Sequence, residues 1–406
     1  MDINDYILRK LNNHVSADLD TFCTAPWYNV YVAPDKKIAP CCNFTPDGFD
    51  YTYNQLDEYF NSSQLKKLRR DLLSGVKNKN CSSCWQDEKN GGDSLRKITN
   101  RTIIEGIQAD VTSMSSQIQK PKVSAIKSFE LVLGNLCNLK CVMCGPQYSS
   151  QLLAEANVHT DIKKLFPNKS FDQTKYNWPK QDDFVEWCNI NLPDAIHIKF
   201  TGGEPFIIPW IQTVIDKIPD EQKKKCILHF TTNLTIVNLG LFENFKKFKE
   251  VWLSVSVEGS EETFEYLRYG HKWETLVTNI KLIKEMNIPN LHLMINHVLQ
   301  TPSYHSILPM TKYFDSLQLE IHPIILSRPK YFQLSSLSKK AKQNFLDISK
   351  NYNGYNKNFI DVARDLTIKN MEQDLEQKEK CTKHLEYFDQ ARKTSYKTII
   401  PVDNFQ

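Results

Sequence analysis

Six short β-rich runs, each followed by a longer segment of helical character, constrain the fold of this 406-residue chain more than any other feature. The runs occupy residues 128–135, 195–202, 226–233, 251–258, 291–298 and 317–326. Among the intervening segments, WETLVTNIKLIKEM at 273–286 places apolar residues at helical spacing. Strands that alternate with helices predict parallel pairing, because a parallel crossover needs a long connection. Six strands are two fewer than a complete barrel has, so we expect an α/β fold built as a partial (β/α)6 TIM-like barrel.

The sequence on either side of these runs predicts two further parts. The first hundred residues hold five cysteines, a hairpin pattern (YNVYVAPDKKIAPCC) and a helical pattern (SSQLKKLRRDLLSG), and the polar stretch 106–122 ends in a proline as a linker does. After residue 330 the chain is rich in Lys, Glu and Asn with helical character. We therefore expect a small N-terminal cysteine-rich α+β domain with its linker at 1–120, the partial barrel at 121–330 and a helical C-terminal extension at 331–406.

Composition excludes several classes of protein. Hydrophobic residues make up 41% and charged residues 24% of the chain, as in ordinary globular proteins. The net charge of +4, from 51 basic and 47 acidic residues, gives no argument for nucleic acid, and short lysine runs are interpreted as solvated helix faces. No apolar run reaches the length of a membrane span, and the first residues lack the pattern of a signal peptide. We expect a cytoplasmic protein with no membrane and no nucleic-acid partner.

Eleven cysteines are unusual for such a protein. Cytoplasmic thiols stay reduced, so metal binding is a better explanation than a disulfide framework. Eight of the cysteines fall into two groups, one before residue 85 and one at 137–144, whereas Cys188, Cys226 and Cys381 stand alone. We interpret these three as small buried hydrophobic side chains.

The segment CNLKCVMC at 137–144 is the sharper of the two groups. Its C-x3-C-x2-C spacing, directly after the first predicted strand, places Cys137, Cys141 and Cys144 on one compact loop. Three soft thiolate ligands suit three irons of a cubane cluster and leave the fourth iron open to another ligand. A zinc knuckle is the alternative, although structural zinc normally closes its site with four ligands.

A second landmark, TGGEP at 201–205, ends the second predicted strand. Two glycines allow the backbone to approach a ligand closely, and Glu204 supplies a carboxylate at the strand end where parallel barrels place their active sites. Taken alone, a turn that merely ends the strand is the alternative interpretation.

Together the cysteine loop and GGEP resemble the radical S-adenosylmethionine (SAM) superfamily, whose loop reads C-x3-C-x-φ-C. Met143 occupies the φ position, where an aromatic residue is usual. The resemblance implies that Cys137, Cys141 and Cys144 hold a catalytic 4Fe-4S cluster at which SAM binds. It further implies that the family's GGE residues, here Gly202, Gly203 and Glu204, bind the amino group of SAM.

Three later segments resemble further SAM contacts of this superfamily. TTNLT offers Asn233, with Leu234 where the family has glycine, and SVSVEG offers Ser256, with Glu258 where aspartate is commoner. EYLRYG offers Arg268 for the carboxylate of SAM, since a guanidinium suits a carboxylate in a forked geometry. A surface salt bridge is the alternative role for this arginine.

The N-terminal cysteines form the second group of candidate ligands. Four positions in a small module favour either a closed zinc site or a second Fe–S cluster, and we expect these four to converge on one metal centre beside the barrel mouth: Cys23, Cys41, Cys81 and Cys84. Cys42 is treated as the spare of the adjacent pair.

The surrounding sequence resembles the twitch domain, a short form of the SPASM domain that binds one auxiliary 4Fe-4S cluster. The twitch domain usually follows the radical SAM core, but here the resemblance lies before it. Chains with this order share a C-terminal segment similar to HLEYFDQARKTSYKTIIPV at 384–402.

The family resemblance also implies a reaction. Reduction of SAM yields a 5′-deoxyadenosyl radical that abstracts hydrogen from a substrate, chemistry that no side chain performs unaided. A one-electron donor such as flavodoxin or ferredoxin is implied as a partner, together with a peptide or protein substrate. A small carbohydrate or nucleotide substrate is the alternative, and a non-enzymatic metal-binding scaffold is the third.

Overall fold

The computed structural model describes residues 20–46, 49–89, 93–106, 111–180 and 182–406. The chain divides into two compact units, each made of separate stretches of sequence. The first unit comprises residues 1–134, 174–230 and 240–251, and the second comprises 135–173, 231–239 and 252–406.

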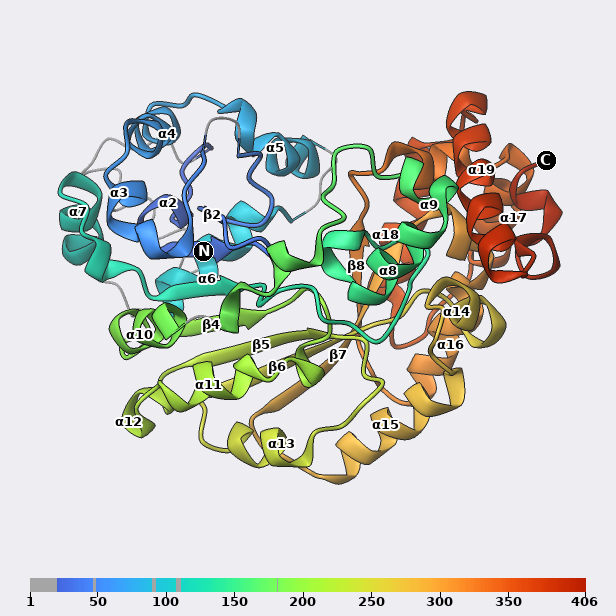
Figure 1. The fold of residues 1–406 in the computed structure, drawn as a ribbon. Coiled ribbons are helices and arrows are strands. Elements are labelled where there is room, and N and C mark those ends of the chain that lie inside the picture. Colours follow the sequence, from blue (N-terminus) through green and yellow to red (C-terminus); the bar gives the residue numbers. More distant parts are fainter. Residues whose placement is uncertain (1–19, 47–48, 90–92, 107–110, 181) are drawn as a thin grey trace. The chain divides into compact units, whose positions relative to one another are not determined.

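The sheet of the first unit has the strand order β2-β1-β3-β4-β5 (Figure 1). Its strands are β1 (Asn29–Val32), β2 (Ile38–Ala39), β3 (Ser128–Leu131), β4 (His197–Phe200) and β5 (Ile227–Thr232). β1 and β2 form an antiparallel hairpin, and all other neighbours pair in parallel, with Asn29 opposite Ser128 and Ser128 opposite His197. The N-terminal hairpin thus adds β1 to the parallel sheet, a pairing that the local sequence pattern did not predict.

Alternating burial along β5 shows why this segment is a strand. Leu228, Phe230 and Thr232 are buried, whereas the residues between them are partly exposed, as the period of two requires. The ring of Phe230 stacks on Phe200 of β4 at 5.0 Å between centroids and also contacts Phe245 of α13 (Leu239–Phe245). One face of the sheet is therefore an aromatic core covered by helices.

Short helices complete the first unit. They are α2 (Ala25–Tyr28), α3 (Leu56–Phe60), α4 (Ser63–Leu73), α5 (Ser82–Lys89), α6 (Leu95–Gly106), α7 (Val111–Gln119), α10 (Asp182–Asn191), α11 (Trp210–Asp216) and α12 (Asp220–Lys223). Helix α7 lies inside the predicted linker. Its Met114 and Ile118, one turn apart, are buried against Trp27 of α2, so tertiary packing makes a helix of a segment that looks polar.

The second unit has the strand order β6-β7-β8. The strands are β6 (Glu250–Ser256), β7 (Leu291–Leu299) and β8 (Ile321–Ile325), and β7 pairs with β8 in parallel. The helices are α8 (Ser150–Val158), α9 (Thr160–Lys164), α14 (Glu261–Leu267), α15 (Trp273–Glu285), α16 (Ile307–Ser316), α17 (Lys339–Ile348), α18 (Lys357–Lys369) and α19 (Leu375–Arg392). All six predicted strands are therefore present, and the prediction of an α/β fold with a mostly parallel sheet is confirmed.

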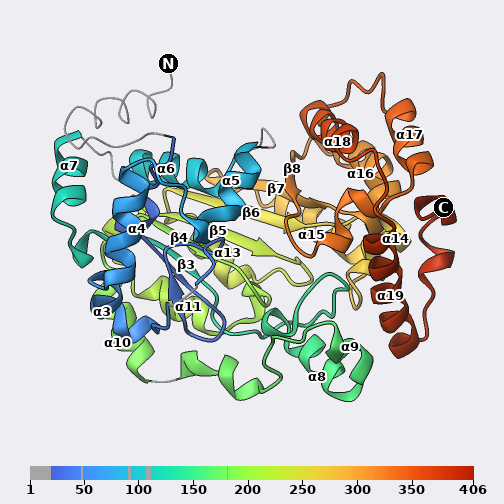
Figure 2. The ribbon, with the colours of Figure 1, turned by 90° about the horizontal axis from the view of Figure 1, so that it is seen from above.

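The C-terminal segment is helical, as predicted, and α17 packs against α18 (Figure 2). The buried side of α19, with Cys381, Leu385 and Phe388, shares a core with Val142 and Leu267. Within the described part of the chain, no helix combines the length and the apolar character needed to cross a bilayer.

Candidate functional site

The loop that carries Cys137, Cys141 and Cys144 lies in the second unit, before helix α8. Two serines at the start of this helix hold the cysteine loop by hydrogen bonds. Ser149 accepts a hydrogen bond from the Leu152 amide as an N-cap and donates one to the Leu139 carbonyl at 2.6 Å. The Ser150 hydroxyl bonds to the backbone of Cys137 at 3.2 Å. The sequence after the cysteines therefore fixes the loop in place.

The three sulfurs share one apolar environment. Cys137 and Cys141 are 8% exposed and cluster with Leu139, while Met143 and Cys144 pack against them. Burial raises the pKa of the Cys144 thiol, and the neighbouring Cys141 and Cys137 raise it further. Three soft donors this close to one another suit an iron–sulfur cluster, whose positive charge would favour their thiolate form.

Asn233 follows β5 and lies against this loop. Its Nδ2 is 3.9 Å from the Cys137 sulfur and 3.1 Å from the Asn138 side-chain oxygen, and its own oxygen accepts a hydrogen bond from the Thr235 amide at 2.9 Å. The buried imidazole of His271 contacts the Asn233 carbonyl at 3.0 Å. The structure therefore brings the predicted residue Asn233 to the cysteine loop.

Leu234 stands where the resembling family has glycine, and its backbone shows why glycine suits that position. Its φ is +54°, in the left-handed region that few side chains adopt without strain. The Thr232 hydroxyl accepts a hydrogen bond from the Leu234 amide at 2.9 Å, and Asn279 donates to the Leu234 carbonyl at 2.9 Å. These two contacts hold a bulky residue in the conformation that glycine adopts freely.

Arg268 also reaches the cysteine loop. Its Nη1 is 4.0 Å from the Cys141 sulfur, and its Nε donates to Glu258. The side chains of Arg268 and Glu258 are 12% and 2% exposed, so this ion pair is buried. The alternative prediction of a surface salt bridge for Arg268 is therefore wrong. Ser256, the last residue of β6, precedes Glu258 by two positions. The guanidinium of Arg268 is thus shared between Glu258 and the site of the cysteines.

Helix α19 contacts the cysteine loop directly, although the two segments are more than 230 residues apart in the sequence. His384 contacts the Val142 carbonyl at 2.9 Å, and Arg392 donates to the Lys140 carbonyl at 2.6 Å. Arg392 also pairs with Glu155 of α8 at 2.7 Å, and both side chains are almost fully buried. The site predictions missed these residues, and the one sequence signal for them is the C-terminal segment 384–402, which contains both His384 and Arg392.

The GGEP segment lies in the first unit, directly after β4. Gly202 and Gly203 have φ values of +71° and +55°, in the left-handed region that favours glycine. The Glu204 side chain is 1% exposed and accepts a hydrogen bond from the Phe206 amide at 3.1 Å. The predicted carboxylate is therefore buried and held in one orientation by its own turn.

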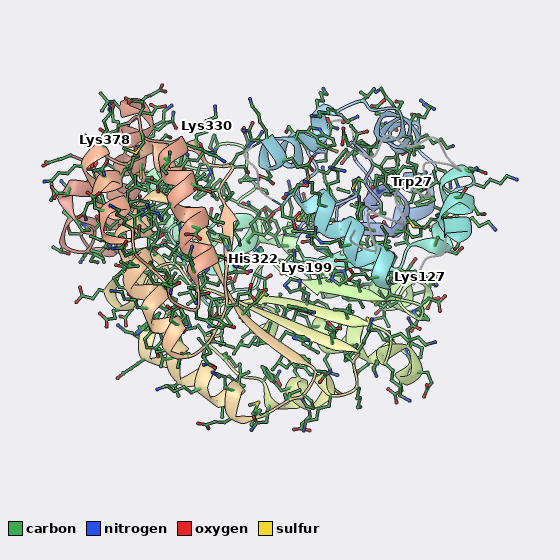
Figure 3. All side chains as sticks on the ribbon, turned by 180° about the vertical axis from the view of Figure 1, so that it is seen from behind. Trp27, Lys127, Lys199, His322, Lys330 and Lys378 are labelled. Atoms are coloured by element: carbon green, nitrogen blue, oxygen red, sulfur yellow. The ribbon has the colours of Figure 1, made fainter. Side chains whose placement is uncertain are left out.

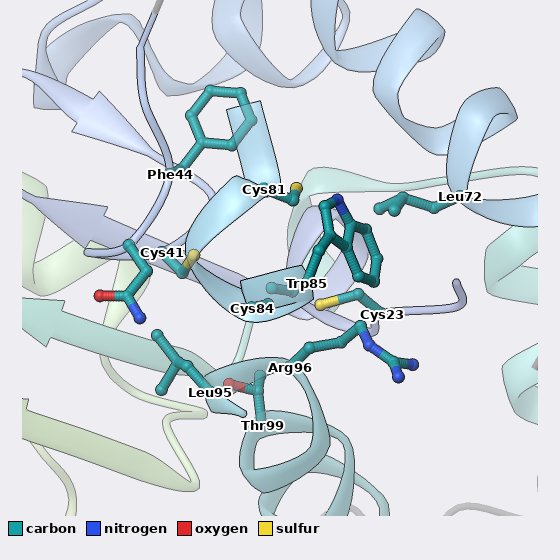
Figure 4. Close-up of a pocket in the computed structure, with 12 residues that line it drawn as sticks. Cys23, Cys41, Phe44, Leu72, Cys81, Cys84, Trp85, Leu95, Arg96 and Thr99 are labelled. Carbon is teal, nitrogen blue, oxygen red and sulfur yellow. The ribbon is translucent and has the colours of Figure 1, made fainter. Parts of the chain in front are cut away.

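The four candidate cysteines of the first unit line a single pocket (Figure 4). Cys23 precedes α2, Cys41 follows β2, Cys81 ends a 3-10 turn and Cys84 lies in α5. Apolar side chains form much of the remaining wall: Phe44, Leu72, Trp85 and Leu95. Among the described residues, no three Cys, His, Asp or Glu side chains are placed to bind a single metal ion.

Electrostatics show that these four thiols influence one another. Burial raises the pKa of Cys23 to about 12, and for Cys41 burial acts together with the other cysteines in the same direction. Burial likewise raises the pKa of Cys81 and Cys84, and bound iron ions are the kind of group that would favour the ionised form of these thiols.

Arg96 ties the walls of this pocket together. It pairs with Glu88 of α5 at 2.9 Å, donates to the Phe22 carbonyl at 2.8 Å and lies 5.5 Å from the centre of the Trp85 ring. The residue before Cys23 and the helix that carries Cys84 are thus joined through one buried guanidinium.

Cys42 does not line the pocket, although it is adjacent to Cys41. Its thiol lies beside the ion pair of Glu130 and Lys199, whose charged atoms are 3.0 Å apart. Although Cys42 is exposed as a residue, partial loss of solvent around its sulfur and the carboxylate of Glu130 both raise the pKa of its thiol. The two neighbouring cysteines thus have separate environments.

Comparison with known proteins gives one relative of low identity. An uncharacterized protein of Methanocaldococcus jannaschii is 24% identical over 173 residues, which are 41% of this chain and 52% of the relative. The chain therefore spans about half the length of the curated relative that it matches.

Solved structures with some likeness include a native anSMEcpe with bound AdoMet and Streptococcus suis SuiB bound to its precursor peptide SuiA. The first has 17% identity and a TM-score of 0.36, with 54% of this chain and 58% of the other covered. The second has 16% identity and a TM-score of 0.37, with 71% and 57% covered.

One protein-family model matches the chain. It is the model described as Radical SAM superfamily, and it spans residues 131–305, from the end of β3 through the cysteine loop and β7. Residues 131–305 of this chain are therefore similar to the Radical SAM superfamily over somewhat less than half of its length.

Proposed function

We propose that this protein is a radical SAM enzyme whose SAM-binding 4Fe-4S cluster is held by Cys137, Cys141 and Cys144. The observation that carries the proposal is that these three cysteines pack together in one loop of the matched segment. When bound, the reduced cluster supplies the electron that cleaves SAM, and the radical produced removes a hydrogen atom from the substrate. The domain belongs to a partial (β/α)6 barrel in this proposal.

The chain's own residues then position SAM and exclude water. Glu204 binds the amino group of SAM, the turn at Gly202 and Gly203 lets the backbone approach the ligand closely, and Asn233 orients the loop through Cys137. Arg268 serves the carboxylate of SAM with the donors that Glu258 leaves free, and Ser256 lies at the neighbouring strand end.

A second, auxiliary 4Fe-4S cluster is proposed in a twitch-like N-terminal domain. The pocket lined by four cysteine sulfurs supports it, because soft thiolates are the usual ligands of such clusters: Cys23, Cys41, Cys81 and Cys84. Complete ligation by cysteine leaves no iron open, so this cluster carries electrons or stabilises the domain. A position beside the barrel mouth and the domain boundaries 1–120, 121–330 and 331–406 belong to the same proposal.

The proposed substrate is a peptide or protein, as the resemblance to twitch proteins implies. The proposed location is the cytoplasm, where a chain with eleven cysteines would keep its thiols reduced. A one-electron carrier such as flavodoxin or ferredoxin is the proposed reductant.

The test is anaerobic reconstitution followed by incubation with SAM and dithionite. Release of 5′-deoxyadenosine is expected from the native protein, and Glu204→Gln should raise the SAM concentration needed for half-maximal release while iron content stays the same. Gln222→Glu, a change at a partly exposed residue of the same unit, is the control. A native protein with a full complement of iron that releases no 5′-deoxyadenosine would refute the proposed function.

A further inference from the structure

A wide groove in the first unit is lined largely by lysines. It encloses about 850 Å³ and follows the beginnings of the parallel strands, where Ile196 precedes β4 and Lys225 precedes β5. Six lysines line it: Lys120, Lys122, Lys127, Lys224, Lys225 and Lys249. Figure 3 labels Lys127 at the beginning of the sheet and Lys199 further along it.

The positive charge of this groove is largely unbalanced. Among the described residues that line it, Asp194 is the one acidic residue and pairs with Lys127 at 3.8 Å, and Lys224 pairs with Glu221 at 2.7 Å. The other four lysines are exposed and make no ion pair with the residues that the structure describes. Since the whole chain carries a net charge of only +4, this groove concentrates charge that a partner can neutralise.

The kind of cation indicates the kind of partner. The described residues that line the groove include no arginine and one aromatic residue, Tyr28, which is 4% exposed and cannot stack on a base. Grooves that bind single-stranded nucleic acid combine basic groups with accessible aromatic rings. Flexible, strongly hydrated lysines without a stacking surface instead suit electrostatic docking of an acidic protein.

Helix α2 links this groove to the cysteine pocket. Ala25 at one end of the helix lines the pocket and Tyr28 at the other end lines the groove, about 5 Å apart along the axis at 1.5 Å per residue. The Lys127 amide donates to the Tyr28 carbonyl at 3.1 Å, and the Gln117 side chain donates to the carbonyls of Trp27 and Lys122. The groove wall is therefore fastened to the element that follows Cys23.

We propose that the lysine groove docks an acidic protein that carries a one-electron centre, and that this protein reduces the auxiliary cluster. The proposal rests on the proposed cluster at Cys23, Cys41, Cys81 and Cys84. In this step the reduced carrier loses one electron and is oxidised, and the auxiliary cluster gains that electron and is reduced. The ring of Phe22, the residue before Cys23, contacts Trp27 of α2 at 5.7 Å between ring centres.

The experiment uses the full chain, reconstituted anaerobically, and reduced flavodoxin as the acidic carrier. Four lysines of the groove are changed together in one variant: Lys120→Glu, Lys122→Glu, Lys225→Glu and Lys249→Glu. A matched variant carries the same charge change at exposed lysines of the second unit: Lys281→Glu, Lys312→Glu, Lys350→Glu and Lys383→Glu. Cluster reduction is followed by stopped-flow absorbance.

Reduction by flavodoxin should slow at least about tenfold in the groove variant and in 0.5 M salt, because electrostatic steering is lost. Reduction by the small cation methyl viologen should not slow, and the matched variant should resemble the native protein. Equal flavodoxin rates in the two variants would overturn the proposal. Tighter binding of an RNA oligonucleotide than of flavodoxin, lost only in the groove variant, would assign the groove to nucleic acid and overturn it as well.

Failure of the underlying cluster is recognised separately. If the reconstituted native protein holds only the iron of one cluster, about four atoms, there is no auxiliary cluster and electron delivery to it is refuted. In that case, the affinity for flavodoxin is measured by titration in the native protein and in the groove variant. Equal affinities would refute docking of the carrier in the lysine groove.

Discussion

The two cysteine sites of this protein are built in opposite ways. Cys137, Cys141 and Cys144 come from eight consecutive residues, and distant elements only brace their loop. Cys23, Cys41 and the C-x2-C pair of Cys81 and Cys84 come from three separate stretches of the chain, so local sequence brings only the last two together. A site made within one loop can be recognised from spacing, whereas a site assembled across 62 residues depends on the surrounding fold.

Loss of one ligand from the compact loop should have the largest effect. Cys141→Ala is expected to abolish release of 5′-deoxyadenosine and to remove about four irons, since three cysteines are the minimum set for the open cluster. Iron analysis and product release measure both effects. Cys226→Ala, at a buried lone cysteine, should keep both, and full activity of Cys141→Ala would contradict the assignment of this loop.

The assembled site gives a sharper comparison between two adjacent cysteines. Cys41→Ser should remove the auxiliary cluster, about four irons, while the signal of the SAM-binding cluster remains. Cys42→Ser should keep both clusters, because Cys42 lies beside Glu130 and Lys199 and outside the pocket. Electron paramagnetic resonance of the reduced proteins distinguishes the two variants. Equal spectra would show that Cys41 is not a ligand.

A third prediction concerns the brace of the compact loop. Arg392→Met leaves the buried carboxylate of Glu155 without its main partner, so unfolding by urea should show a loss of about 3–5 kcal/mol. Lys380→Met removes the exposed pair with Glu376 on the same helix and should cost about 0.5 kcal/mol. A similar loss in both variants would show that α19 does not brace the loop through Arg392.

The smallest predicted effect is a pH dependence of this brace. Burial alone would raise the pKa of the Glu155 carboxyl, but Arg392 and Lys140 hold it below its usual value. The stabilisation is therefore present above the ordinary glutamate pKa of about 4.3 and is lost as the pH falls through the lower folded value. The stability difference between the native protein and Arg392→Met should narrow from pH 7 to pH 4. A constant difference would contradict this role of Glu155.

Much of the fold follows from local pattern. The six predicted strands are all present, because an alternating pattern of buried residues, as in β5, can be predicted from the local sequence. The positive φ values of Gly202 and Gly203 agree with the turn that two glycines predict. Helix α7 and the parallel pairing of β1 with β3 were not predicted, since both depend on packing partners far away in the sequence.

By itself, then, the sequence determined the alternation of strands and helices, the spacing of the compact cysteine loop, and the glycine turn in the GGEP segment. The tertiary structure alone decided that Arg268 pairs with Glu258 at a cysteine, that Arg392 and His384 hold the loop, and that Cys42 lies apart from Cys41. The physical reason is that periodicity and φ preference act between near neighbours in the chain. Charges and sulfurs separated by many residues find their partners only when the packed core places them side by side.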